Sequence, residues 1–382
     1  MRLFVIKKFL AGIIIMKKIA LLGSTGSIGL QVLNAVRLHP NSFTIVGLVA
    51  NDDSKEFNRQ VKIYAPKYYA AASKNKEQAL EIAGLEEADV IFNAVTGFAG
   101  LEYSLRAIKA GKELALANKE TLVCGGELVN RLLKNSTTEL LPVDSEHSAI
   151  WQCLNYKREA SFKKLILTAS GGPFRSYSPE QLEKVTPTQA LAHPNWAMGR
   201  KITVDSATLL NKAYEVIEAH ELYNAPYSKI ETVIQPTSVV HSLVEFADGA
   251  VMAQMGAPDM QVPVQLALTY PRHMSTTAQT LSFKKAMTVE FLPLNRKQYP
   301  LYDLGLNCGK EGGTLPCALN AADEVAVKAF LDGKIKFTDI FTTVERVIST
   351  TERDEVVSFK QLDEVDRNAR WKAQKLIYKL SV

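Results

Sequence analysis

Cysteine is scarce in this chain of 382 residues, which has four cysteines and no CxxC pair. Disulfide-stabilised secreted scaffolds and most structural zinc sites need denser or paired cysteines, so we exclude both classes. Reduced thiols are typical of proteins that work in the cytosol. We therefore expect a cytoplasmic protein.

Long apolar runs and long runs of one charge are also missing. No segment reaches the roughly 20 apolar residues that a transmembrane helix needs, so we expect no membrane partner. The net charge is only +5 and no Lys/Arg tract occurs, so we expect no nucleic-acid partner. Residues 1–15 mix lysine with apolar residues but reach Met16 without a cleavage site, which indicates an upstream extension rather than a signal peptide.

The first third of the chain alternates strand and helix patterns. The apolar run Lys18 to Leu22 leads into GSTGSIG and a helical apolar face, and a second strand follows at 44–50. Further strands are predicted at 89–95 and 113–117, and helices at 55–64, 75–83 and 100–110. The alternation predicts an α/β fold with a Rossmann-like, doubly wound parallel sheet over residues 16–144.

The rest of the chain no longer shows the regular alternation of strands and helices. Residues 145–270 read as an α+β catalytic domain, 271–300 as a connecting segment and 301–382 as a helical C-terminal domain. In the middle region we predict strands at 164–168, 230–234, 242–246 and 250–254 and a helix over 208–223.

The glycine motif GxxGxxG stands between a predicted strand and a predicted helix. Glycines let a dinucleotide pyrophosphate approach the backbone, and the helix N-terminus supplies unpaired N–H groups, so the motif predicts cofactor binding. Residues after the second strand select between NAD and NADP, and here they are Asn51, Asp52 and Asp53. This signal is mixed: either aspartate could favour NAD, or both could face solvent while Asn51, Ser54, Lys55 or Arg59 receives the phosphate.

Acidic residues supply the pattern of a metal site. Asp144 and Glu146 follow a strand-like run, and two residues apart in extended chain they would project on the same side. Their oxygens suit a hard cation such as Mg²⁺ or Mn²⁺. Asn211, Lys212 and Glu215 share one flank of the predicted helix and could complete the site. Taken singly, each of these residues fits a solvated helix position better than a ligand. His147 could be a ligand or a base, but it fits a structural histidine at a helix start better.

Two further segments could bind a ligand. SGGPFR, starting at Ser170, follows a strand and has the small residues of an oxyanion-binding turn, although an ordinary loop fits as well. The segment 190–201 carries Trp196 between proline and glycine and could be a lid that excludes water. A buried core tryptophan is the alternative.

At this point the motifs resemble those of a known family. GSTGSIG, LANKETLV, LLPVDSEH, SGGPFR, HPNWAMGRKITVDSATLLNKAYEVIEA and LNAADEVAV occur in the order seen in the reductoisomerases of the methylerythritol phosphate pathway, which makes isoprenoid precursors. The resemblance covers residues 16–382. It implies isomerisation and reduction of a sugar phosphate, 1-deoxy-D-xylulose 5-phosphate, to 2-C-methyl-D-erythritol 4-phosphate by a homodimer that uses NADPH and Mn²⁺, Mg²⁺ or Co²⁺.

The resemblance also implies roles for individual residues. The implied metal ligands are Asp144, Glu146 and Glu215, and the implied catalytic residues are Lys119, Glu146 and His193. The implied cofactor contacts are Thr25, Gly26, Ser27, Ile28, Asn51, Asn118, Glu120 and Gly199. The implied substrate contacts are Lys119, Ser145, Glu146, Ser170, His193, Trp196, Ser206, Asn211, Lys212 and Glu215.

One departure from the family pattern concerns the cofactor. Family members carry Gly followed by basic or amide residues after the second strand, where this chain has Asn51-Asp52-Asp53, so the choice of NADPH over NADH stays open. Three other functions compete with the reductoisomerase hypothesis. A redox-free sugar-phosphate isomerase or aldolase with the same metal site would leave the dinucleotide fold unused. A semialdehyde-type dehydrogenase would need an activated thiolate, for which neither Cys124 nor Cys153 has a motif. A non-catalytic dinucleotide sensor would leave Lys119 and the carboxylates without a purpose.

Overall fold

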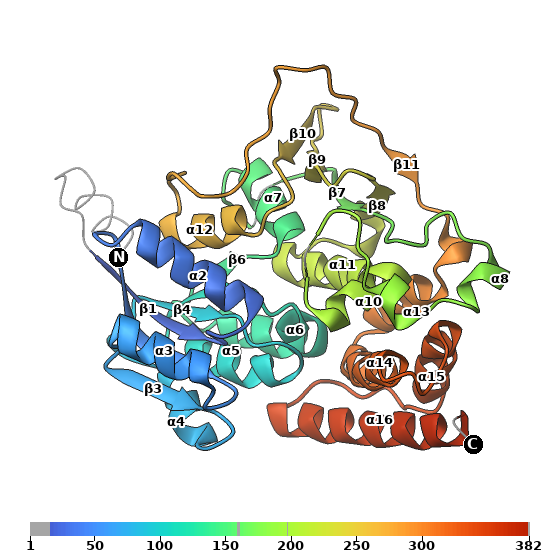
Figure 1. The fold of residues 1–382 in the computed structure, drawn as a ribbon, viewed down its shortest axis with the longest axis horizontal. Coiled ribbons are helices and arrows are strands. Elements are labelled where there is room, and N and C mark those ends of the chain that lie inside the picture. The colour runs from blue at the N-terminus through green and yellow to red at the C-terminus, as the bar shows by residue number, and fades with distance from the viewer. Residues whose placement is uncertain (1–15, 159–160, 197, 381–382) are drawn as a thin grey trace.

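The N-terminal part of the computed structural model is a six-stranded parallel sheet with helices on both faces (Figure 1). The structure describes residues 16–158, 161–196 and 198–380, so the expectation for residues 1–15 lies outside it. The strand order is β3-β2-β1-β4-β5-β6, which confirms the Rossmann-like prediction. The strands are β1 (Lys17–Leu22), β2 (Phe43–Ala50), β3 (Tyr68–Ala71), β4 (Val90–Asn93), β5 (Glu113–Leu116) and β6 (Leu140–Pro142). The helices are α2 (Ser27–Leu38), α3 (Lys55–Tyr64), α4 (Lys76–Ile82), α5 (Ala99–Lys109) and α6 (Glu120–Leu133).

The turn after β1 has the geometry that its glycines predict. Gly23 adopts a φ of +82°, a conformation that costs glycine little, and a Cβ on Gly29 would lie 2.3 Å from the Gly23 oxygen. Gly23 and Ser24 both donate their N–H to the Val49 carbonyl, at 2.8 and 2.9 Å. The turn is therefore tied to the end of β2, and α2 starts directly behind it.

A second, mixed sheet occupies the middle of the chain, in the order β10-β9-β7-β8-β11. The strands predicted at 164–168, 230–234, 242–246 and 250–254 are confirmed. The strands are β7 (Lys164–Ala169), β8 (Ile230–Ile234), β9 (Val240–Glu245), β10 (Val251–Met255) and β11 (Leu292–Pro293). The helices of this part are α7 (Ser145–Cys153), α8 (Pro179–Leu182), α9 (Pro187–Ala190), α10 (Arg200–Thr208), α11 (Leu210–Tyr223) and α12 (Gln261–Thr269), with the 3₁₀ turn η1 (Tyr227–Lys229).

Helices form the C-terminal part, as predicted. After the 3₁₀ turn η2 (Arg296–Gln298), the structure has α13 (Pro300–Glu311), α14 (Leu315–Leu331), α15 (Phe337–Ser349) and α16 (Phe359–Leu380). Pro300 occupies the first turn of α13, where its missing N–H costs no hydrogen bond.

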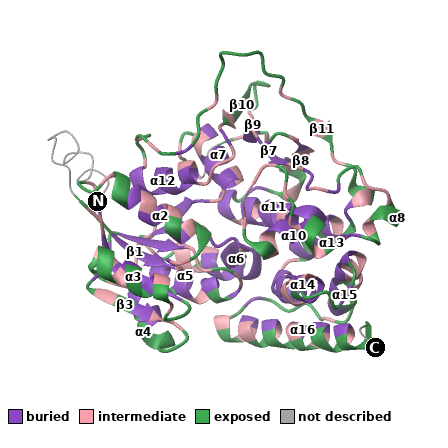
Figure 2. Ribbon diagram, in the orientation of Figure 1, coloured by how far each residue is buried: buried purple, intermediate pink, exposed green. Residues whose placement is uncertain are grey.

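One element crosses the domain boundaries expected from the sequence. Helix α12 follows the second sheet in the chain but packs on α2 of the first domain, where Asn34 donates to Gln261 at 2.9 Å. Buried residues run through both sheets and into α11 and α14, as the purple segments of Figure 2 show. Among the described residues, no helix is both long and apolar enough to cross a bilayer. The expected domain limits remain a prediction.

Candidate active site

Three carboxylates converge where the first sheet meets the second part of the chain. Ligand oxygens of Asp144, Glu146 and Glu215 all lie within 4.8 Å of one another. Asp144 comes directly after β6 and caps α7, accepting the N–H of Ser145 at 2.9 Å, and Glu146 lies in the first turn of that helix. The expected extended geometry for 144–146 is therefore wrong, because the cap turns the chain into a helix. The three carboxylates nevertheless converge as predicted, because Glu215 on α11 faces the first turn of α7.

Two buried lysines neutralise these carboxylates. Lys119 Nζ lies 2.7 Å from Asp144 Oδ2 and 3.0 Å from Glu215 Oε1, and Lys212 Nζ lies 2.6 Å from Glu146 Oε1 and also contacts Glu215. Burial alone would lower the pKa of Lys119, but Asp144 and Glu215 hold it well above its usual value. Both lysines are therefore cationic, and three carboxylates against two ammonium groups leave a net negative charge.

This centre fits a divalent cation by the chemistry of its donors. Burial raises the pKa of Asp144, yet Lys119 and then His147 offset it and hold the value at about 2, so this carboxylate stays ionised. Burial and the Glu146 charge raise the pKa of Glu215. Clustered carboxylates that repel one another are stabilised by a cation, and oxygen donors suit Mg²⁺ or Mn²⁺.

Two further buried titratable residues, His147 and Glu218, lie next to the predicted metal ligands. The sequence analysis singled out only His147. His147 Nε2 lies 2.9 Å from the Glu215 carbonyl, which can only accept, so this nitrogen carries a proton. The other nitrogen, Nδ1, lies 3.5 Å from Glu218 Oε2 and 3.9 Å from Asp144 Oδ2. Burial raises the pKa of Glu218 well above its usual value. Glu218 was missed, although its place three residues after Glu215 puts both on one flank of α11.

The predicted oxyanion turn and the predicted lid meet at Ser170. His193 Nδ1 accepts the N–H groups of Asn195 (3.2 Å) and Trp196 (3.0 Å), so the proton of this ring is on Nε2, 3.1 Å from Ser170 Oγ. Ser170 Oγ also accepts the Gly172 N–H at 3.1 Å. With both lone pairs engaged, the Ser170 hydroxyl has its hydrogen left to donate to an anionic ligand.

The segment predicted to be a lid is anchored to the loop between β8 and β9. The Asn195 amide donates to the Pro236 carbonyl at 2.7 Å and to Ser238 Oγ at 2.8 Å. Trp196 is partly exposed and lies 6.0 Å, ring to ring, from His241. Residue 197 lies outside the described residues. Trp196 is therefore not a fully buried core residue, and its role as a lid remains a prediction.

The predicted cofactor contacts, apart from Gly199, follow the carboxyl ends of β1, β2 and β5 in the first sheet. Thr25, Gly26, Ser27 and Ile28 form the turn at the start of α2, and Gly199 caps α10 with open space around its Cα. Asn118 donates to Glu120 at 2.8 Å and to the Gly97 carbonyl at 3.0 Å. The structure thus brings Asn118 and Glu120 together next to Lys119.

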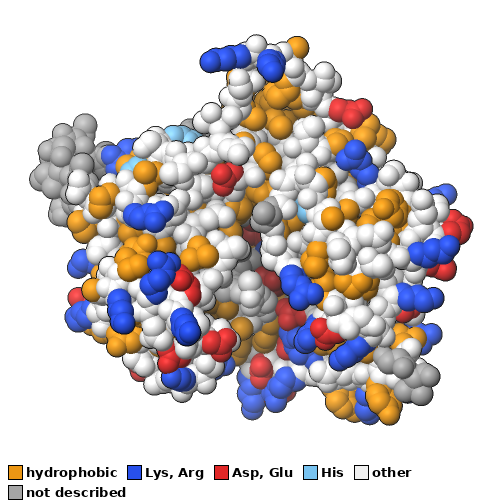
Figure 3. Space-filling view, in the orientation of Figure 1, with side chains coloured by type: hydrophobic (Ala, Val, Ile, Leu, Met, Phe, Trp, Pro, Cys, Tyr) orange, Lys and Arg blue, Asp and Glu red, His pale blue; other side chains and the backbone are white. Residues whose placement is uncertain are grey.

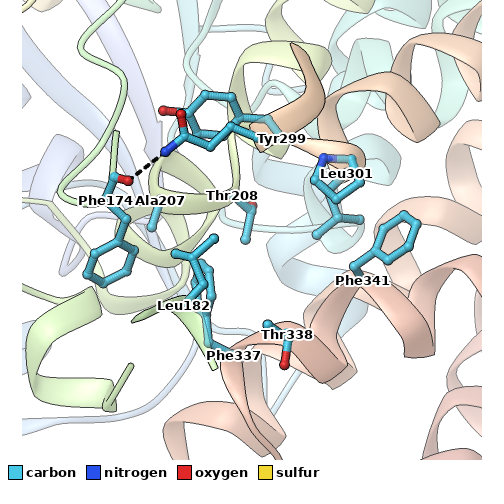
Figure 4. A pocket seen from close by; sticks show the side chains of 11 residues that line it. Phe174, Leu182, Ala207, Thr208, Tyr299, Leu301, Phe337, Thr338 and Phe341 are labelled. Carbon is cyan, nitrogen blue, oxygen red and sulfur yellow. Dashed lines mark hydrogen bonds between the residues drawn. The ribbon is translucent and has the colours of Figure 1, made fainter. Parts of the chain in front are cut away.

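An apolar pocket lies next to Phe174 of the predicted oxyanion turn (Figure 4). Its volume is about 140 Å³. The Gln298 amide donates to the Phe174 carbonyl at 2.8 Å and the Tyr299 hydroxyl to the Gly171 carbonyl at 2.9 Å, so the pocket wall fixes the turn. The lining residues are Phe174, Leu182, Ala207, Thr208, Gln298, Tyr299, Pro300, Leu301, Phe337, Thr338 and Phe341. None is ionisable at neutral pH, so this is no place for a sugar phosphate.

The surface is hollowed between the first domain and the helices opposite it, with acidic side chains in the hollow (Figure 3). A dinucleotide fold and an acidic centre at its carboxyl edge define the class: an oxidoreductase with a cation site next to its cofactor domain. The chain belongs to the 1-deoxy-D-xylulose 5-phosphate reductoisomerase family. It is 46% identical to the reductoisomerase of Chlorobium limicola over 95% of this chain and all of that protein, and 44% identical to that of Chlorobaculum tepidum with the same coverage.

Family profiles and solved structures agree with this assignment. Residues 19–126 match the profile of 1-deoxy-D-xylulose 5-phosphate reductoisomerase, and residues 140–223 and 255–372 match two C-terminal domain profiles of the same enzyme. A reductoisomerase crystallised with NADPH, fosmidomycin and magnesium is 35% identical, with a TM-score of 0.88 over 96% of this chain and 99% of that one. The Zymomonas mobilis enzyme in complex with NADPH is 36% identical, with a TM-score of 0.86 over 95% and 99%.

Proposed function

We propose that this chain converts 1-deoxy-D-xylulose 5-phosphate to 2-C-methyl-D-erythritol 4-phosphate, with NADPH as reductant and a divalent cation, Mg²⁺ or Mn²⁺, at the acidic centre. The observation that carries the proposal is the convergence of Asp144, Glu146 and Glu215 within 4.8 Å at the edge of a dinucleotide-binding sheet. Membership of the reductoisomerase family supports the same reaction.

The acidic centre supplies the chemistry of rearrangement. Asp144, Glu146 and Glu215 would hold the cation, which supplies Lewis acidity to the ketone and hydroxyl oxygens of the substrate. Lys119 Nζ, between Asp144 and Glu215, is placed to stabilise negative charge on a substrate oxygen. The Ser145 hydroxyl bonds the Glu146 carboxylate and could orient it for proton transfer.

The phosphate end of the substrate is proposed to bind on the other side of the centre. The Ser170 hydroxyl has a hydrogen to donate, and the Gly172 backbone packs against Ser206 on α10, where a Cβ on this glycine would lie 2.7 Å from the Ser206 oxygen. Asn211 accepts from Lys119 at 2.8 Å, which keeps the start of α11 next to the reacting groups. Lys212 was expected on the phosphate side, and its contacts with Glu146 and Glu215 leave that role a prediction.

NADPH supplies the hydride for the second half of the reaction. The glycine turn before α2 and the edge formed by Asn118 and Glu120 are placed to bind it. His193 links Ser170 to the backbone of Trp196, so binding of the phosphate at Ser170 would help order the lid and exclude water.

The experiment follows NADPH absorbance at 340 nm with 1-deoxy-D-xylulose 5-phosphate, with and without Mg²⁺ or Mn²⁺. Metal-dependent oxidation is the expected result, with product identity checked by mass spectrometry. Folded protein that binds NADPH but never oxidises it would overturn the proposal and favour a nucleotide-sensing role.

We also propose that the chain works in the cytoplasm as a homodimer. Strand β10 is the free edge of the second sheet, and its Val251, Met252 and Met255 are 52, 51 and 38% exposed. Apolar residues on an open edge strand are a liability unless a partner covers them. Met252→Lys should lower the molar mass measured by light scattering towards that of one chain, and an unchanged mass would contradict this interface.

A further inference from the structure

The loop after β2 lies beside the loop after β3 and forms one rim of the cofactor crevice. Ala72 and Ser73 donate their N–H groups to the carbonyls of Ala50 and Asn51, both at 2.9 Å. The same end of β2 anchors the glycine turn through the Val49 carbonyl. In a sheet of this strand order, the ribose that carries the adenine lies at this rim, so its 2′ substituent meets the residues that follow Ala50.

Two cations near this rim, Lys74 and Arg59, already have carboxylate partners. Lys74 contacts Asp53, which also accepts from Asn58 at 2.7 Å, and these two hydrogen bonds lower the pKa of Asp53. The guanidinium of Arg59 forms two hydrogen bonds to Glu56, both 2.8 Å. A 2′-phosphate arriving here must therefore compete with Asp53 for Lys74 and with Glu56 for Arg59.

Asp52 has no such neutralising partner. Its side chain is exposed, and within residues 16–158, 161–196 and 198–380 it forms neither a hydrogen bond nor an ion pair. It stands 23 positions after Gly29, close to the spacing at which an acidic residue accepts a hydrogen bond from a free ribose hydroxyl. The same carboxylate repels a phosphate at that position. Lys55, which is also exposed, adds one positive charge to the rim and Asp52 one negative charge, so the rim offers no excess positive charge to NADPH.

We propose that Asp52 relaxes the cofactor choice of this chain, so that it uses NADH alongside NADPH with catalytic efficiencies within about tenfold of each other. The inference rests on the proposed function, because it concerns the reductant of that reaction. The chemistry is otherwise unchanged: the carbonyl carbon accepts a hydride from whichever nucleotide is bound, its oxygen takes up a proton, and the nucleotide leaves oxidised.

Two measurements on the full chain test the proposal. The first compares kcat/KM for NADPH and NADH at saturating 1-deoxy-D-xylulose 5-phosphate and Mg²⁺. The second measures the Kd of NADP⁺ and NAD⁺ by calorimetry without substrate, so it reports on the rim even if turnover fails. Ratios within tenfold in both measurements support the inference. A preference for the phosphorylated nucleotide above tenfold in either one overturns it.

Two variants with opposite expected effects identify the residue responsible. Asp52→Asn removes the repulsion and should tighten NADP⁺ binding by roughly tenfold, the order expected for one unit charge next to a phosphate, while NAD⁺ binding weakens. Lys74→Gln leaves Asp53 with Asn58 but without a cation, and it should weaken NADP⁺ binding with little change for NAD⁺. Asp363→Asn, on the exposed side of α16 where Asp363 pairs with Arg367 at 3.0 Å, is the charge-matched control and should change neither ratio.

The outcomes separate the two proposals. If the protein oxidises neither nucleotide in the presence of substrate and metal, the proposed reaction is wrong. The ratio of the Kd values for NADP⁺ and NAD⁺ would still decide the role of Asp52. Oxidation of NADPH with an NADH efficiency more than tenfold lower would leave the reaction standing and overturn the inference. An Asp52→Asn variant with an unchanged Kd ratio would overturn it as well.

Discussion

Two buried acidic clusters occur in this molecule, and they differ in what surrounds them. The first holds Asp144, Glu146 and Glu215 around Lys119 and Lys212. The second joins α10 to α14: Lys201 Nζ lies 2.6 Å from Asp205 and 2.7 Å from Asp323, whose side chains are 3 and 0% exposed. No group of three metal-ligating residues forms at the second cluster within the described part of the chain.

The difference shows that buried carboxylates alone do not make a reaction centre. In the first cluster the carboxylates come from two helices and converge at the edge of the cofactor sheet. In the second, a single lysine joins two carboxylates from neighbouring helices. Burial, and after it the charge of Asp323, raises the pKa of Asp205 well above its usual value. The first cluster has the geometry of a candidate cation site, and the second joins two helices through ion pairs.

The largest effect should come from breaking the first cluster. Glu215→Gln keeps the shape of the side chain but removes a charge that faces both lysines. We expect turnover to fall about 10³-fold and Mn²⁺ affinity to fall more than about 100-fold, with little loss of folded structure. NADPH oxidation and Mn²⁺ titration by electron paramagnetic resonance measure both quantities. Normal Mn²⁺ affinity in this variant would remove Glu215 from the metal site.

Breaking the second cluster should affect stability instead. Lys201→Met leaves Asp205 and Asp323 without their cation, and removing one partner of a buried pair costs about 3 kcal/mol in the free energy of unfolding. Urea unfolding measures this loss. Mn²⁺ affinity should not change. If it falls as far as in Glu215→Gln, the two clusters are coupled and the contrast drawn between them is wrong.

A histidine near the first cluster should make stability depend on pH. Burial lowers the pKa of His241 to about 4, from 6.5 when it is exposed. The unfolded chain therefore binds a proton between pH 6.5 and 4 that the folded chain does not, so stability is complete above pH 6.5 and falls as the pH drops towards 4. The loss amounts to about 3 kcal/mol at 1.36 kcal/mol per pKa unit. Urea unfolding at several pH values should show a shallower fall in His241→Gln, and parallel curves would contradict the assignment.

An exposed pair gives the smallest expected effect. Lys164 Nζ lies 2.9 Å from Glu231, with side chains 41 and 51% exposed. Because water and salt screen such a pair, Glu231→Gln should change the free energy of unfolding by less than about 1 kcal/mol. The variant is a control for Glu215→Gln, with the same substitution on the surface. A loss comparable to that of Lys201→Met would undo the distinction between buried and exposed pairs.

Much of the fold could be predicted from the sequence because local patterns set it. Helix α3 was predicted at 55–64 and β8 at 230–234, and both occur at these limits. The edge strand β3 was missed, since YYAA is four residues long and carries no alternation. The extended reading of 144–146 failed for a local reason as well: Asp144 is a good N-cap, and capping outweighed the strand pattern before it.

Only those parts of the site that belong to a local sequence motif could be predicted. Asp144, Glu146 and Glu215 could be grouped by residue type and spacing. The pairing of Lys201 with Asp323 could not, because more than a hundred residues separate them and each alone reads as a solvated helix residue. The neutralisation of Asp53 by Lys74 also needed the structure, because it depends on β3 lying beside β2.

The position of Asp144 directly after β6 has a consequence for engineering. The last strand of the cofactor sheet and the first residue of the cation site are separated by Val143 alone, and Lys119 stands on the same domain. A chimera that imports a foreign nucleotide domain ending at β6 would therefore replace Lys119 together with the glycine turn. Grafts that change the cofactor are better confined to the loops after β2 and β3, where no residue of the acidic centre is transplanted.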